Sequence, residues 1–202
     1  MSVVSSNKKI RALLRIGHGY AEYGQLVLAG MHPRDINVAT QNNVLIKIKK
    51  GLYRVSDTPA ASHQGFADAA RAISGAVICL VSALDYHGLT TFNPSLVSVA
   101  LPRSASMPKI AYPPTELYRF SKTQYEAGIT QIKIAGIMVN IYSPEKTICD
   151  CFRYRNKLGL DLAKEGLAEY LKKKNKNLDT LLTLAQLCRI KPLMETWLRA
   201  MT

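Results

Sequence analysis

Polar and basic side chains between residues 34 and 54 have the chemistry of a nucleic-acid contact surface. Asparagine and glutamine amides can form bidentate hydrogen bonds with adenine, and arginine pairs in the same way with guanine. Lysine ammonium groups bind backbone phosphates, and the release of condensed counterions drives that binding. The candidate DNA-binding residues are Arg34, Asn37, Gln41, Asn42, Lys47, Lys49, Lys50 and Arg54.

Three short helices are predicted to position the first four of these residues. Apolar residues recur with helical spacing before residue 43, glycines punctuate the pattern, and a proline suits the first position of the last helix. The helices are expected at Ser6 or Asn7 to Ile16, at residues 23–29, and at residues 33–42.

The segment Leu45–Ser56 is predicted to be a basic β-hairpin. Apolar and basic residues alternate along it, the alternation breaks at Gly51, and it then resumes. One face would be apolar, and the other would carry Lys47, Lys49 and Arg54. Helices followed by a basic hairpin are the layout of a winged helix-turn-helix. A solvated helix in a protein-docking winged helix is the alternative.

The rest of the chain predicts a second domain of mixed α+β structure. A polar linker with a proline, residues 57–62, separates residues 1–57, the winged helix-turn-helix, from residues 58–202. Two helices are expected at 64–73 and 76–86. A small antiparallel sheet of three or four strands follows, at 96–101, 116–121, 131–134 and 137–142. Helices at 145–155, 161–174 and 178–190, and a short last one around Trp197, complete it.

The two ends of the chain are basic, within a net charge of +13. Residues 1–57 carry nine Lys/Arg against three acids, and residues 153–202 carry eleven against five, whereas the middle is nearly neutral. A basic end favours polyanions. A second candidate basic surface is Lys172, Lys173, Lys174 and Lys176, for which a solvated helix end is the simpler interpretation.

Catalytic, metal and cofactor sites are not expected. Cysteines and histidines are dispersed without metal-ligand spacing, and no glycine-rich phosphate loop is present. Asp150 is expected to pair with Lys146 or Arg153, and His87 to cap a helix end. With no membrane span or secretory signal predicted, a cytoplasmic, reduced location is expected. The chain is therefore not expected to be an enzyme.

The order of these segments resembles the AbiEi antitoxins of bacterial toxin–antitoxin and abortive-infection (phage-defence) systems. The resemblance runs from about Lys9 to Cys188. It rests on a basic hairpin ending in KGLYRVSD, then ICLVSALDYHGL, SVALPR and SPEKTICDCFRYRNKLGLDLAKEGLAEYLK. The combination of the hairpin with the Ser-Pro-Glu-Lys-Thr helix is more specific to this family than a winged helix alone.

The resemblance implies two functions. The N-terminal winged helix would bind inverted repeats in double-stranded DNA upstream of its own operon and repress it. The C-terminal domain would counteract a cognate nucleotidyltransferase toxin of the AbiEii type, by direct contact or indirectly. A DNA-binding transcriptional regulator without a toxin partner is the alternative, and the identity of the neighbouring gene would discriminate the two.

Overall fold

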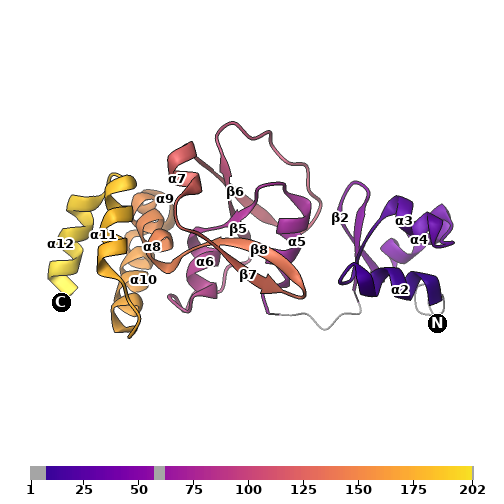
Figure 1. Ribbon diagram of the computed structural model, residues 1–202, viewed down its shortest axis with the longest axis horizontal. Helices are drawn as coiled ribbons and strands as arrows, with labels where there is room; N and C mark the ends of the chain where they lie inside the picture. The colour runs from indigo at the N-terminus through magenta and orange to yellow at the C-terminus, as the bar shows by residue number, and fades with distance from the viewer. Residues whose placement is uncertain (1–7, 57–61, 202) are drawn as a thin grey trace. The chain divides into compact units, whose positions relative to one another are not determined.

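The computed structural model describes residues 8–56 and 62–201 of this α+β protein (Figure 1). The chain divides into two compact units. Unit 1 comprises Met1–Ser74, Met107–Pro114 and Lys133–Met138, and unit 2 comprises Gly75–Ser106, Thr115–Ile132 and Val139–Thr202. The predicted start of the first helix, at Ser6 or Asn7, and linker residues 57–61 lie outside the described residues.

Unit 1 contains the three predicted helices and the predicted hairpin. Their register also reveals a short strand that the sequence pattern did not predict, β1. In chain order the elements are α2 (Lys8–Ile16), β1 (Tyr20–Glu22), α3 (Tyr23–Leu28), α4 (Pro33–Gln41), β2 (Leu45–Lys49), β3 (Leu52–Val55) and α5 (Gln64–Ala72).

The three strands form an antiparallel sheet in the order β1-β3-β2. Residues opposite one another in a sheet point to the same face. Ala21 lies opposite Tyr53, and both join the buried core with Ile10, Leu26 and Ile36 of the three helices. Tyr20 lies opposite Arg54, so these two side chains share the other face.

Two segments that are distant in sequence complete unit 1. The backbone N–H groups of Ala111 and Tyr112 donate hydrogen bonds of 2.9 and 3.1 Å to the carbonyl oxygen of Ile48 in β2. Gly136 lies against the imidazole of His18, where an added Cβ would come within 2.3 Å of Nδ1. A side chain at position 136 would therefore displace the His18 ring.

Unit 2 is built on a five-stranded mixed sheet in the order β6-β5-β4-β8-β7. The prediction of a small antiparallel sheet was wrong, because β4 pairs in parallel with β8 and β5 pairs in parallel with β6. The strands are β4 (Val77–Ile78), β5 (Val97–Pro102), β6 (Thr115–Phe120), β7 (Ile129–Ile134) and β8 (Ile137–Tyr142), and residues 133–138 at the β7–β8 turn belong to unit 1.

The helix predicted over residues 76–86 is a strand followed by a helix. Val77 and Ile78 form the central strand β4, Cys79 is extended, and α6 covers only Leu80–Tyr86. Every residue from Val77 to Leu80 is fully buried. A short, fully buried apolar run has no polar face, so its periodicity does not distinguish a strand from a helix.

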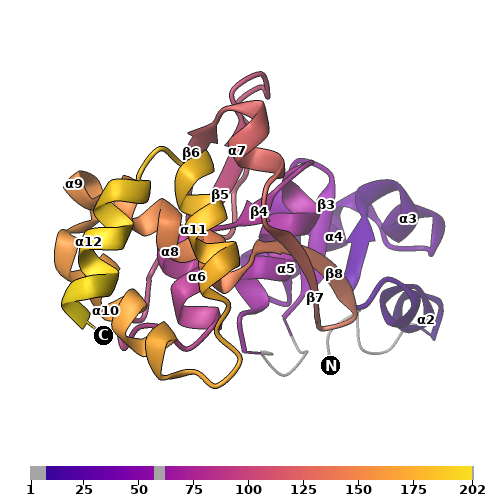
Figure 2. The same cartoon turned by 60° about the vertical axis from the view of Figure 1, so that its left-hand side comes forward.

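Helix α8 lies at the centre of the helical part of unit 2, where it contacts α6, α10 and α11 (Figures 1 and 2). It begins as predicted: Ser143 caps it by accepting a hydrogen bond from the Lys146 N–H, and Pro144 occupies the first turn. The helices of unit 2 other than α6 are α7 (Lys122–Glu126), α8 (Pro144–Arg153), α9 (Arg155–Leu158), α10 (Leu160–Lys172), α11 (Leu178–Leu187) and α12 (Lys191–Met201).

Candidate nucleic-acid interface

Helix α4 has one buried face and one polar, exposed face. Ile36 and Ala39 are buried in the unit 1 core. Arg34, Asn37 and Gln41 are exposed, and their spacing of three and four residues places them along one stripe of the helix. Asn42, the last of the predicted contact residues on this helix, is also exposed at its C-terminal end. The stripe presents the donor and acceptor groups that base edges require.

The position of α4 is fixed by a tight connection from α3. The N–H of Met31 donates a 3.0 Å hydrogen bond to the Leu26 carbonyl, and both side chains are buried. His32 then caps α4 by accepting a hydrogen bond from the Arg34 N–H. The exposed stripe of α4 thus lies on a packed helix rather than on a loop. A packed helix holds the positions of its side chains more precisely than a loop does.

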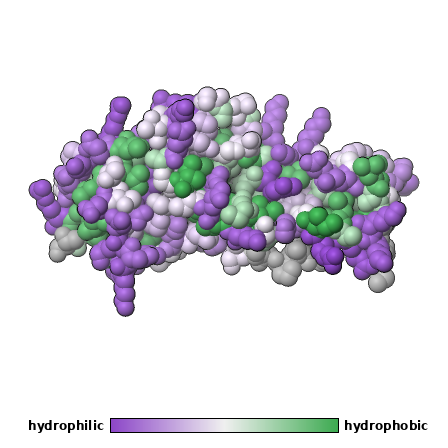
Figure 3. Space-filling model, in the orientation of Figure 1, coloured by the Kyte–Doolittle hydropathy of each residue, from purple (hydrophilic) through white to green (hydrophobic). Residues whose placement is uncertain are grey.

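Apolar side chains are also exposed on unit 1. Val38, on α4, is 45% exposed, and Leu28 is 88% exposed at the end of α3. In Figure 3 hydrophobic patches lie among hydrophilic side chains over unit 1. An apolar side chain beside amide groups can contact the methyl group of thymine, so Val38 extends the chemistry of the α4 stripe.

The predicted basic face of the hairpin is divided by a bulge. Lys47 lies opposite Tyr53, whereas Lys49 lies opposite Leu52, and the register shifts between the two lysines. Lys47 is exposed, but Lys49 is half-buried and its Nζ donates a 3.0 Å hydrogen bond to the Ala72 carbonyl of α5. Lys50 is exposed at the turn. Lys47 and Lys50 are therefore the lysines of the hairpin most open to solvent.

The prediction that Arg54 lies on an exposed basic face was wrong. Its side chain is buried, and its Nε donates a 2.8 Å hydrogen bond to Oδ1 of Asp68, which also accepts a 2.6 Å bond from the Tyr20 hydroxyl. Burial raises the pKa of Asp68, and Arg54 and Tyr20 oppose that rise. Helix α5 thus covers this face of the sheet through an ion pair.

A sequence signal for this pair exists in α5. Asp68 stands between Phe66, Ala67 and Ala69 in a helix whose neighbouring residues are apolar. An acid at such a position is buried, and a buried acid requires a cation or several donors. The signal predicts that a partner exists. It does not reveal that the partner is Arg54, because the two residues are 14 positions apart.

The candidate C-terminal basic surface is partly engaged in unit 2. Lys172 pairs with Glu169 at 2.6 Å, and Lys173 donates a 2.6 Å hydrogen bond to the carbonyl oxygen of His87. Lys174 and Lys176 are exposed, and Lys176 makes a 3.5 Å contact with the Lys173 carbonyl. Three of these four lysines therefore make polar contacts within unit 2, whereas Lys174 makes none with the described residues.

The polar groups buried in unit 2 have structural partners. Lys146 and Asp150 form the predicted ion pair and are both fully buried. The Lys146 ammonium also lies 4.2 and 4.9 Å from the ring centres of Tyr142 and Phe120. His87 is the C-cap residue of α6, as predicted, but its side chain bonds elsewhere: Nε2 lies 2.8 Å from the carbonyl oxygen of Tyr142 in β8.

The cysteine thiols are not arranged for nucleophilic chemistry. All four are buried. Burial raises the pKa of each thiol, to about 12 in the case of Cys188. A thiol, unlike a thiolate, is a poor nucleophile and a poor metal ligand. In residues 8–56 and 62–201, no group of three or more His, Cys, Asp or Glu side chains could hold a metal ion.

Comparisons with known proteins add no family to these observations. The chain matches no protein-family model and no curated protein. Among the helices of the described ranges, none has the length and apolar character needed to cross a membrane.

Proposed function

We propose that α2, α3, α4 and the β1-β3-β2 sheet form a winged helix-turn-helix that binds double-stranded DNA. The observation that carries this proposal is the exposed stripe of Arg34, Asn37 and Gln41 on a helix whose opposite face is buried. Lys47 and Lys50 on the hairpin add phosphate-binding charge. We do not include Arg54 among the proposed DNA contacts, because its charge is paired and buried.

We also propose that the whole chain is an antitoxin and transcriptional autorepressor rather than an enzyme. This part rests on the resemblance of the sequence to the AbiEi antitoxins. The proposed partners are inverted repeats in its own promoter and a nucleotidyltransferase toxin.

Binding to the upstream DNA of its own gene tests the DNA-binding proposal. The affinity of the full-length protein for this DNA and for a scrambled duplex would be measured by fluorescence anisotropy across a salt series. A preference of at least tenfold, or about 1.4 kcal/mol or more, is expected. Equal and steeply salt-dependent binding to both duplexes would refute a specific operator.

Two kinds of variant separate base recognition from phosphate binding. Asn37→Ala and Gln41→Ala are expected to reduce the preference for the operator, by about 1–3 kcal/mol for each lost bidentate contact. Lys47→Ala is expected to weaken binding to both duplexes equally. If Asn37→Ala and Gln41→Ala leave the preference intact, α4 is not the element that reads the sequence.

Co-expression tests the antitoxin proposal. If the adjacent gene encodes a nucleotidyltransferase, its expression is expected to stop growth, and this chain is expected to restore it. The absence of such a neighbour would favour the stand-alone regulator.

A further inference from the structure

A hollow at the turn of the β2–β3 hairpin gathers cations from two separate elements. It has a volume of about 370 Å³ and is lined by Glu22, Lys49, Lys50, Gly51, Leu52 and Arg71. Three cations and one acid give the lining a net charge of +2. Arg71 comes from α5, beyond the segment in which the sequence predicted DNA contacts.

The backbone of the turn is held in place and is open to solvent. The carbonyl oxygen of Gly51 accepts a 2.8 Å hydrogen bond from the N–H of Tyr23, which ties the turn to the start of α3. Gly51 has a φ of +79°, and a Cβ placed there would have no atom within 4 Å. The turn thus offers fixed geometry without a side chain that blocks approach.

Contacts within unit 1 hold the side chains of Arg71 and Lys49 in place at the rim of the hollow. The Arg71 guanidinium lies 5.5 Å from the ring centre of the buried Tyr20, and Arg71 itself is exposed. Lys49 is held by the Ala72 carbonyl at the end of α5. A guanidinium that packs on a ring with one face keeps its N–H edge for an anion, to which it donates two parallel hydrogen bonds.

We propose that this hollow binds one backbone phosphate of DNA, with Arg71 and Lys50 as its direct ligands. The proposal rests on the DNA-binding function proposed above and extends the contact surface onto α5. A phosphodiester fits better than a small free anion. Glu22 in the lining repels a multiply charged free anion more strongly than a singly charged phosphodiester.

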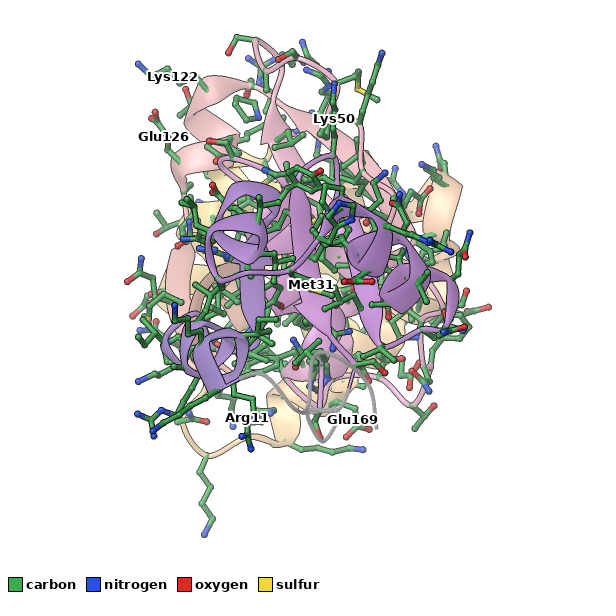
Figure 4. The ribbon with its side chains drawn as sticks, turned by 90° about the vertical axis from the view of Figure 1, so that its right-hand side faces the viewer. Arg11, Met31, Lys50, Lys122, Glu126 and Glu169 are labelled. Atoms are coloured by element: carbon green, nitrogen blue, oxygen red, sulfur yellow. The ribbon has the colours of Figure 1, made fainter. Side chains whose placement is uncertain are left out.

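The salt dependence of DNA binding tests the assignment of Arg71. Arg71→Gln leaves Lys50 as the remaining ligand of this phosphate, so the negative slope of log K against log salt is expected to become less steep, by at most about 0.9, the value for a whole lost phosphate contact. Arg11→Gln removes the same charge from an exposed site on α2. Figure 4 shows Arg11 and Lys50 at opposite edges of unit 1, with the core residue Met31 between them. Arg11→Gln is expected to leave the slope unchanged.

Three outcomes are decisive. A loss confined to Arg71→Gln supports the site, and Arg71→Lys should then restore the slope because it restores the charge. Equal losses in both variants would overturn the site in favour of diffuse attraction. An unchanged Arg71→Gln slope would also overturn it, and would assign these cations to a protein-facing surface.

Replacement of single phosphates by neutral methylphosphonates adds a direct test. At one position in the operator duplex, the replacement should weaken binding of the wild-type protein more than binding of the Arg71→Gln variant, in which Lys50 still contacts that phosphate. If no such position exists, the proposed contact is wrong. Failure of the proposed function looks different, because the wild-type protein would then show no operator preference in the first place.

Discussion

The burial of Arg54 predicts that this residue stabilises the fold and does not bind DNA. Arg54→Met keeps most of the aliphatic stem and removes the charge, which leaves Asp68 buried without its cation. Breaking a buried pair by removing one partner costs about 3–5 kcal/mol. The Tyr20 hydroxyl still donates to Asp68 in the variant, so the lower end of this range is the better expectation.

Urea unfolding followed by far-UV circular dichroism measures this cost. For a slope of about 2 kcal/mol per M, a loss of 3 kcal/mol lowers the midpoint by about 1.5 M. The single tryptophan, Trp197, lies in α12 of unit 2, so its fluorescence reports unit 2 separately. Lys47→Met is the matched control, and as an exposed substitution it is expected to change stability by less than about 0.5 kcal/mol.

The pH dependence gives the same prediction a second check. Burial already raises the pKa of Asp68, and loss of Arg54 raises it further. The native variant therefore binds a proton that the unfolded chain releases. Its stability increases as the pH falls from above the native pKa of Asp68 toward the pKa of the unfolded chain. The cost of Arg54→Met should shrink as the pH is lowered toward about 4, the ordinary range of an aspartate pKa.

One result would refute the reasoning about Arg54. If Arg54→Met unfolds at the wild-type urea concentration but binds DNA with a reduced salt slope, the arginine contacts phosphate and the buried ion pair is not its role.

Three further predictions concern unit 2. Lys146→Met leaves Asp150 buried and unpaired, and is expected to lower the urea midpoint seen by Trp197 fluorescence by an amount that corresponds to about 3–5 kcal/mol; an unchanged midpoint would contradict the ion pair. Burial lowers the pKa of His87, so wild-type stability should fall as the pH drops below about 6.5, and His87→Gln should flatten the fall between about pH 6.5 and pH 5. The four buried thiols should react with a disulfide reagent only after denaturation, and rapid labelling of the native protein would show that they are accessible.

The elements that the sequence predicted well are those with a buried face and a polar face. The helical period of α4 and the proline at its start were sufficient to place it, and the alternation around Gly51 placed the hairpin. Strands β1 and β4 have three and two residues, too few for any period to show. Both depend on partners elsewhere in the chain, which a local pattern does not contain.

The exposure of the candidate residues was predicted correctly on α4 and for Lys47 and Lys50, but not for Lys49 and Arg54. Alternation assigns Lys47 and Arg54 to faces only if the register is regular, and the bulge after Lys47 breaks it. Which face is covered depends on α5, beyond the predicted linker. The same helix brings Arg71 to the hairpin turn, so one element both removes Arg54 from the surface and adds a cation to it.

The discontinuity of unit 1 determines when this unit can finish folding during synthesis. Residues 107–114 and 133–138 belong to unit 1, and Ile48 in the hairpin accepts hydrogen bonds from Ala111 and Tyr112. Unit 1 is thus incomplete until residue 138 has been synthesised. At about 5–20 residues per second, that is about 4–16 s after residue 56. Until Ala111 and Tyr112 have been synthesised, the Ile48 carbonyl lacks these two hydrogen-bond donors. A gene truncated after residue 74 would make a protein that lacks them permanently.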